Sequence, residues 1–122
     1  MVWDYEMSGI VLSLVVLQSQ NIEDTRLFYQ HLLGEELKEE QHGNGPKHYS
    51  CLLGEFILEI YPQRTNERGT DQLGFVVDSL EQILDCVAPE YVRRGPFDTV
   101  DGRGLLLRDP DGRLVYLEEK RT

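Results

Sequence analysis

The chain has 122 residues, which suits one domain and is too short for two domains with separate cores. Hydrophobic residues make up 40% of it and charged residues 28%, the proportions of a folded globular protein and not of a disordered or fibrous chain. With 12 basic and 22 acidic side chains, the formal net charge is −10. This charge repels a phosphate backbone, so we expect no binding to nucleic acids and a preference for neutral or cationic ligands.

The sequence also indicates where the protein resides. No apolar run approaches the roughly 20 residues of a membrane-spanning helix. The first residues, MVWDYEM, lack the basic start and apolar middle of a signal peptide. We therefore expect a cytoplasmic protein without a membrane partner. Cys51 and Cys86 lie in apolar patterns without the spacing of a metal-binding pair, so both are expected to be buried free thiols.

The first half opens with a predicted strand at residues 10–17, which is rich in Ile, Val and Leu. Asn21 is typical of a helix N-cap, and the two acidic residues at positions 23–24 suit the positive end of the helix dipole. Apolar residues then recur with helical spacing as far as Gly34, where a left-handed C-cap is expected.

Three short strands are expected next, at residues 37–41, 49–53 and 56–61. The glycines, asparagine and proline of residues 42–47 predict a loop. Gly54 and Glu55 separate the last two strands by the length of a tight hairpin turn, and glycine at the first position favours type II′. A turn at these residues pairs Ser50 with Glu59 across the hairpin.

The second half repeats the first at an offset of 58 positions, since residues 72–82 follow the pattern of residues 14–24 and 72 minus 14 is 58. An apolar strand, a helix cap and an acidic second helical position recur in register. A duplicated unit cannot close a hydrophobic core alone, so the two copies must pack together. The space between them is then the natural place for a ligand.

The helix of the second copy is expected to begin after Ser79, whose spacing to Gln82 is that of a capping box, and to end before Pro89. Residues 93–96, Arg-Arg-Gly-Pro, predict a basic turn. Strands are expected at residues 73–77, 97–100, 104–108 and 113–118.

The order β-α-β-β-β therefore occurs twice, in modules at approximately residues 8–62 and 71–119 of one domain that spans residues 1–122. With this order, the sequence resembles the glyoxalase, bleomycin-resistance and extradiol-dioxygenase superfamily, also called vicinal oxygen chelate proteins. The motifs that carry the resemblance are Phe28-Tyr29, Leu33-Gly34, Leu58-Glu59-Ile60, Phe75-Val76-Val77-Asp78 and Asp109-Pro110-Asp111-Gly112. The resemblance implies an α+β fold of two tandem βαβββ modules, whose curved mixed sheets surround a cleft, usually in a homodimer.

The resemblance also implies four ligand positions for a divalent metal ion. They correspond to Leu14, Glu59, Gln72 and Tyr116, where the family usually has His, Glu, His and Glu. Leu14 has no lone pair and a neutral tyrosine is a poor ligand, so the full four-ligand site is not expected. A shift of two residues would place Glu118 at the fourth position. We therefore expect no cofactor, and the alternative is one divalent metal ion.

Alternation along the hairpin divides its side chains between two faces of the sheet. An apolar set is suited to packing beneath a helix: Tyr49, Cys51, Leu53, Phe56, Leu58 and Ile60. The opposite set is mixed polar and aromatic, as in a small-molecule site: His48, Ser50, Leu52, Ile57, Glu59 and Tyr61. Across both modules, the predicted ligand-binding residues are His48, Ser50, Ile57, Glu59, Tyr61, Gln72, Phe97 and Tyr116.

Glu59 and His48 are the candidate catalytic residues. The Glu59 carboxylate lies between two apolar residues, so it must be exposed to water, paired or functional. His48 is either a general base or hydrogen-bond donor near Glu59, or a polar strand residue without a role. His31 and His42 are expected in solvent.

These observations favour a homodimeric protein that sequesters a hydrophobic or cationic small molecule in its cleft without a metal. Two alternatives remain open. One is a metal-dependent lyase like glyoxalase I, or a dioxygenase, that uses Glu59, Gln72, His48 or Glu118. The other is an interaction domain with a vestigial cleft. The sequence does not decide whether a reaction is catalysed, or whether the modules pair within one chain or between two.

Overall fold

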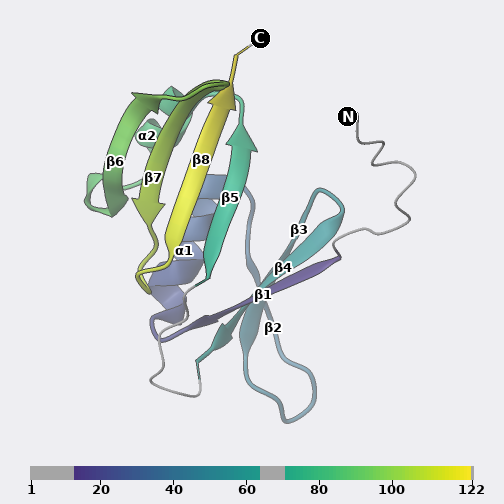
Figure 1. Cartoon of the computed structure of the whole chain (residues 1–122). Helices are drawn as coiled ribbons and strands as arrows, with labels where there is room; N and C mark the ends of the chain where they lie inside the picture. Colours follow the sequence, from purple (N-terminus) through teal and green to yellow (C-terminus); the bar gives the residue numbers. More distant parts are fainter. Residues whose placement is uncertain (1–12, 64–70, 122) are drawn as a thin grey trace.

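The computed structural model describes residues 13–63 and 71–121 (Figure 1). The part of the predicted first module before residue 13, which includes the start of the first predicted strand, lies outside the described residues. Within them, the order β-α-β-β-β occurs twice, as predicted. The strands form two four-stranded sheets that are inclined to each other (Figure 1).

The first module consists of β1 (Leu14–Ser19), α1 (Ile22–Leu33), β2 (Lys38–Glu40), β3 (His48–Leu53) and β4 (Phe56–Pro62). Its sheet has the order β1-β4-β3-β2, in which β1 is parallel to β4 and the other pairs are antiparallel. Gly54 has a φ of 63° and Glu55 a negative φ, the signs that a type II′ turn requires. As predicted, Ser50 pairs with Glu59.

The second module consists of β5 (Gln72–Val77), α2 (Leu80–Cys86), a 3₁₀ helix (Pro89–Tyr91), β6 (Val92–Asp98), β7 (Gly102–Arg108) and β8 (Leu114–Lys120). Its sheet has the equivalent order β5-β8-β7-β6. The offset of 58 positions holds at the starts of β1 and β5, residues 14 and 72, and of α1 and α2, residues 22 and 80. In the last strands the register gives an offset of 57, because Ile57 pairs with Leu14 and Leu114 pairs with Gln72. The internal repeat of the sequence is therefore a repeat of structure.

Each helix begins at the cap that the sequence predicts. Ser79 precedes α2, and its hydroxyl accepts a hydrogen bond from the backbone N–H of Gln82 at 3.3 Å. Asn21 precedes α1, and Gly34 ends that helix with a φ of 67° in the left-handed region. No helix in the described part of the chain is long and apolar enough to cross a membrane.

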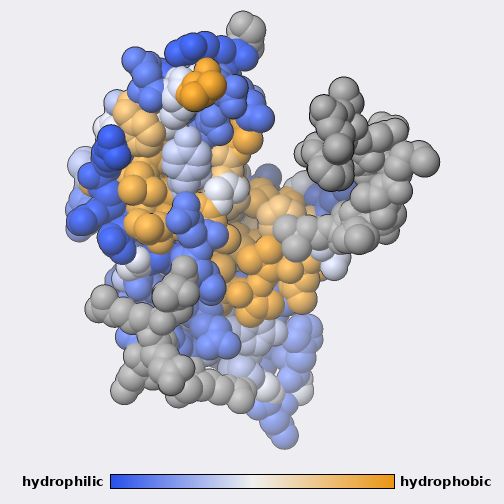
Figure 2. All heavy atoms as spheres, in the orientation of Figure 1, coloured by the Kyte–Doolittle hydropathy of each residue, from blue (hydrophilic) through white to orange (hydrophobic). Residues whose placement is uncertain are grey.

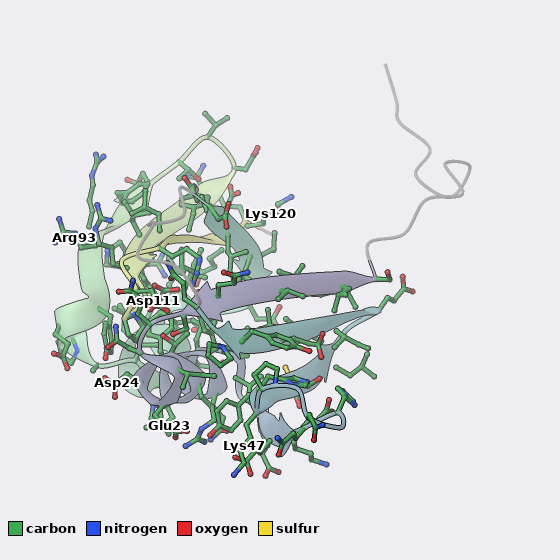
Figure 3. The ribbon with its side chains drawn as sticks, turned by 90° about the horizontal axis from the view of Figure 1, so that it is seen from below. Glu23, Asp24, Lys47, Arg93, Asp111 and Lys120 are labelled. Atoms are coloured by element: carbon green, nitrogen blue, oxygen red, sulfur yellow. The ribbon has the colours of Figure 1, made fainter. Side chains whose placement is uncertain are left out.

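The start of α1 is capped from the other module. The Asn21 side chain makes no capping hydrogen bond. Instead, the Asp111 carboxylate accepts hydrogen bonds from the backbone N–H of Gln20 at 2.9 Å and of Asn21 at 3.3 Å. Figure 3 shows Asp111 beside the end of α1 that carries Glu23 and Asp24. The turn between β7 and β8 thus holds the first helix in place.

The same turn carries a buried polar network between the modules. Asp109 is buried, and its carboxylate accepts hydrogen bonds from the Tyr29 hydroxyl at 2.7 Å and from the Arg113 guanidinium at 2.5 Å. Arg113 also donates to the backbone oxygen of Gln18 at 2.8 Å. Every buried side-chain nitrogen and oxygen atom in this network has a hydrogen-bond partner. The network therefore orients the modules without leaving a buried polar group unpaired.

Apolar side chains of both modules form one buried cluster. Residues that are at most 6% exposed include Leu17, Phe28, Tyr29, Leu32, Leu58, Ile60, Leu80, Leu105, Leu107, Val115 and Leu117. They come from both helices and from the sheet faces next to them, while no helix of residues 13–63 and 71–121 covers the opposite face of either sheet. This arrangement leaves each sheet with one packed face and one open face.

The sixth strand differs from the prediction. β6 begins at Val92, five residues before the expected residue 97, and includes the Arg-Arg-Gly-Pro segment that predicted a turn. Its pairing with β7 shifts between Val92 and Arg94 and again between Arg94 and Phe97. Because β6 is the edge strand of its sheet, a glycine and a proline without an N–H interrupt the ladder without ending the strand.

The two cysteines differ in burial. Both are free thiols, but Cys51 is buried and Cys86 is exposed. The predicted burial is therefore confirmed for Cys51 and wrong for Cys86. Cys86 lies outside the helical stripe that Leu80 begins and Val87 completes, so it faces away from the core.

Candidate functional site

The open face of the first sheet carries an exposed apolar surface. Four large side chains on it are between 41% and 66% exposed: Leu14, Val16, Leu52 and Ile57. We call these four residues the apolar strip. They are neighbours across the sheet, since Ile57 pairs with both Leu14 and Leu52. Figure 2 shows hydrophobic surface in this region, where the two sheets diverge.

A polar group lies on the same face, next to the apolar strip. Glu59 pairs with Ser50 across the hairpin and with Val16 on β1, and its side chain is 16% exposed. Its Oε2 atom lies 3.4 Å from Nε2 of His48. Of the predicted alternatives, full exposure is therefore excluded: Glu59 is partly buried and lies close to His48, and whether it has a function stays a prediction.

His48 is buried, although strand alternation places it on the open face. Its side chain is 1% exposed because Tyr61 stacks on it, with ring centroids 4.1 Å apart and planes only 9° from parallel. The Tyr61 hydroxyl lies 3.3 Å from His48 Nε2. Desolvation, with the nearby carboxylates of Glu59 and Glu40, raises the pKa of Tyr61, so this hydroxyl stays protonated at neutral pH.

The open face of the second sheet offers an aromatic surface. Phe97 and Tyr116 lie with ring centroids 6.5 Å apart, and the guanidinium carbon of Arg94 lies 4.9 Å from the Phe97 centroid. We call these three residues the aromatic platform. A Cβ atom at Gly104 would approach the Phe97 ring to 2.8 Å, so glycine there lets the ring lie across the sheet. Sequence reasoning missed Arg94 because its segment was interpreted as a turn.

The predicted ligand-binding residues fall into two groups on two sheets. His48, Ser50, Ile57, Glu59 and Tyr61 share the open face of the first sheet. Gln72, Phe97 and Tyr116 belong to the second sheet. Among the described residues, no hydrogen bond, ion pair or ring contact joins the two groups. Whether they serve one site stays a prediction.

The strand register places two of the four family-type metal positions in each sheet, at equivalent places in the two modules. Leu14 pairs with Ile57, two residues before Glu59. Gln72 pairs with Leu114, two residues before Tyr116. Tyr116 is thus the counterpart of Glu59, and Glu118 lies two residues further along. With a leucine and a tyrosine at two of the four positions, the side chains do not fit the family's metal ion, and no reaction step through it follows.

A different group of potential ligands lies near the first sheet's edge. Donor atoms of Glu40, His42 and His48 all lie within 4.8 Å of one another. His42 was expected in solvent, and its side chain is indeed 74% exposed. The sequence contained no signal for this group, because its members share no regular spacing.

A groove of about 590 Å³ lies on the helical side of the molecule. Its wall is mainly apolar and includes Leu33, Phe56, Phe75, Val77 and Ile83. None of the predicted ligand-binding residues lines it. The groove is of a size that suits a small ligand, and its polar lining side chains are His31, Asp78, Ser79 and Gln82.

Comparison with solved structures identifies the fold. The antibiotic binding protein TnmS3 from Streptomyces sp. CB03234 matches with a TM-score of 0.73 and 21% identity, over 94% of this chain and 99% of that one. A glyoxalase/dioxygenase from Nostoc punctiforme matches with a TM-score of 0.70 and 17% identity, over 100% and 98% of the two chains. The chain has the glyoxalase and bleomycin-resistance fold. The motif resemblance and the predicted paired βαβββ modules are therefore confirmed at the level of the fold.

A third glyoxalase-fold structure extends the comparison. The glyoxylase/bleomycin resistance protein/dioxygenase domain from Frankia sp. EAN1pec matches with a TM-score of 0.64 and 21% identity, over 94% of this chain and 99% of that one. No family model and no curated protein sequence matches the chain. At these identities the glyoxalase fold is shared, whereas activity depends on the side chains of the site.

Proposed function

We propose that the protein binds a hydrophobic or cationic small molecule on the open faces of its sheets, without a metal ion at the family-type positions. The observation that carries this proposal is the apolar strip, which is exposed beside the carboxylate of Glu59. Large apolar side chains gain free energy when a ligand removes them from water. A carboxylate beside them provides an acceptor for one cationic or hydrogen-bonding group.

Charge supports a cationic rather than an anionic ligand. The chain carries a formal net charge of −10, so its field attracts cations. Glu40 and Glu59 both lie 3.4 Å from Nε2 of His48, which places two acidic side chains at the same end of the sheet. The Tyr116 ring on the second sheet offers a π face to a planar or cationic group.

One structural neighbour supports the class of function. TnmS3 is described as an antibiotic binding protein. Sequestration of a small molecule requires affinity alone and no catalytic metal. A chain with the same fold that lacks two of the four family-type ligands is compatible with such a role.

We also propose that the protein is a homodimer. Within the chain, the modules are joined on their helical sides, through α1, α2 and the turn that holds Asp109. The open faces remain exposed, and β1 and β5 are edge strands. A second copy whose second sheet faces the apolar strip would cover this surface and bring the two groups of predicted ligand-binding residues to one cleft. This arrangement pairs modules between two chains.

Fluorescence titration with planar probes tests the small-molecule proposal. The probes are thioflavin T as a cation and anilinonaphthalene sulfonate as an anion, both with EDTA present. We expect preferential binding of the cation. Glu59→Gln should weaken it roughly tenfold or more, the effect of losing one charge-assisted contact. Glu39→Gln is the matched control, because Glu39 is exposed on β2 and pairs with Tyr49 of the opposite face.

Three results would contradict the proposal. Absence of binding for every probe, with no effect of Glu59→Ala and His48→Ala on any property, would favour an interaction domain. Equal loss of affinity in Glu59→Gln and Glu39→Gln would place the ligand elsewhere. Turnover of an added substrate that depends on nickel, zinc, manganese or iron, with metal bound at Glu59, would favour the lyase or dioxygenase alternative.

A further inference from the structure

We propose that Glu40, His42 and His48 bind one divalent transition metal ion of the zinc class. The three residues come from the end of β2, the following loop and the start of β3. Two imidazoles and one carboxylate form a donor set that suits zinc, nickel or cobalt and not magnesium or calcium. The site shares no residue with the four family-type metal positions.

The spacing of the donor atoms fits such an ion. Oε2 of Glu40 lies 3.5 Å from Nε2 of His42 and 3.4 Å from Nε2 of His48. Two ligands about 2.0–2.1 Å from a tetrahedral ion are roughly 3.4 Å apart. Two of the three separations therefore already match. The third separation, between the ligand nitrogens of His42 and His48, is at most 4.8 Å. It shortens if the exposed His42 ring turns.

His48 has the hydrogen bond that orients a metal-binding histidine. Its Nδ1 atom lies 3.2 Å from the backbone oxygen of Pro46. A carbonyl oxygen only accepts hydrogen bonds, so Nδ1 carries the hydrogen and the neutral ring has its lone pair on Nε2. Donation from one ring nitrogen to a backbone carbonyl, with the other nitrogen free to bind, is typical of histidine ligands.

The surroundings of His48 Nε2 are negatively charged. Carboxylate oxygens of Glu40 and Glu59 both lie 3.4 Å from it, and the residue is 1% exposed. A lone pair that faces two carboxylates away from water is repelled by them. The Tyr61 hydroxyl also lies within hydrogen-bonding distance of Nε2, at 3.3 Å, and a metal ion bound at this nitrogen would replace it there. A metal ion bound at Nε2 would supply a positive charge between these two carboxylates.

An ion at this position has two consequences. Three protein ligands leave at least one coordination position for water or another ligand, because zinc binds four ligands. The ion also ties the loop after β2 to the start of β3, so binding should stabilise the fold. Glu40 and His42 are 41% and 74% exposed, which leaves the ion a path from solvent.

Metal titration of tag-free protein, treated with EDTA and dialysed, tests this proposal. We expect calorimetry with zinc chloride to give one ion per chain and the melting temperature to rise. Cobalt chloride should give the visible absorption of a tetrahedral site. His42→Ala and Glu40→Gln should each weaken zinc binding at least about tenfold. Both side chains are exposed enough for the variants to fold, which the buried His48 does not guarantee.

His31→Ala and Glu39→Gln are the matched controls, because both residues are exposed and lie outside the group. We expect them to bind zinc like the unmodified chain. Absence of zinc binding at millimolar concentration would overturn the proposal. Unchanged binding in His42→Ala and Glu40→Gln would overturn it as well. The dye titrations contain EDTA, so failure of the small-molecule proposal is distinguishable from failure of this one.

Discussion

His48 illustrates what local pattern reveals about a single residue and what it omits. Alternation along β3 correctly placed it on the open face with Ser50 and Glu59. Alternation predicts exposure for that face, but His48 is buried, since Tyr61 stacks on it and Pro46 contacts its edge. Its nearness to Glu40 and His42 depends on how the loop folds back, and no periodicity of the sequence encodes that.

Tyr29 allows a prediction for stability at alkaline pH. Burial, followed by the charge of Asp109, raises the pKa of Tyr29 well above its ordinary value. The folded state thus binds this proton more tightly than the unfolded state. The bound Tyr29 proton contributes in full to the free energy of unfolding below the ordinary tyrosine pKa of about 10. This contribution is lost as the pH rises above that value. Tyr29→Phe should lower the free energy of unfolding by about 1.5–3 kcal/mol at neutral pH, because a hydrogen bond to a charged group is lost.

Urea unfolding at neutral pH and above the ordinary tyrosine pKa checks this prediction. The unmodified chain should lose more stability between the two conditions than Tyr29→Phe does. Tyr116→Phe is the control and should keep the full pH dependence, since Tyr116 lies on the open face of its sheet without a hydrogen bond to Asp109. An identical pH dependence in all three proteins would contradict the assignment.

At the scale of elements, the starts of the helices were predictable and their partners were not. Asn21 is the N-cap of α1, as the sequence indicates, yet the capping hydrogen bonds come from Asp111, 90 residues away. The turn around Asp109 was found as a motif, whereas its contact with Tyr29 in the first module appears only in the folded chain. β6 was placed too late because glycine and proline end most central strands but not an edge strand.

Gly104→Ala should disturb the aromatic platform. The added Cβ would lie 2.8 Å from the Phe97 ring and 3.0 Å from the Tyr116 ring, so at least one ring must move. We expect a loss of roughly 1–3 kcal/mol in the free energy of unfolding, as for other overpacked positions, and a changed near-ultraviolet circular dichroism spectrum. Gly74→Ala is the matched control on the same sheet, because nothing lies within 4 Å of a Cβ atom there. Equal effects of the two substitutions would contradict the packing argument.

At the scale of the whole molecule, the two modules pack through their helices and leave the open sheet faces outward. The apolar strip is then a surface that a second copy would cover. We expect size-exclusion chromatography with light scattering to find a dimer for the unmodified chain and a smaller species for Leu52→Lys. Leu52 is 66% exposed within the chain, so its replacement should not unfold a single copy.

Val100→Lys is the control for this experiment, because Val100 is 94% exposed in the turn between β6 and β7, away from the apolar strip. It should remain dimeric. A monomer for the unmodified chain at high concentration, or an unchanged dimer for Leu52→Lys, would show that the apolar strip is not the interface.

The sequence by itself determined the repeat, the order of elements, the hairpin register and the absence of ligands such as Leu14 at the family-type metal positions. All of these follow from local spacing and from the chemistry of single side chains. The tertiary structure decided the course of β6, the capping of α1 by Asp111, the burial of His48 and the meeting of Glu40, His42 and His48. Each of these depends on how separate segments fold against one another, and such contacts leave no periodic trace in the chain.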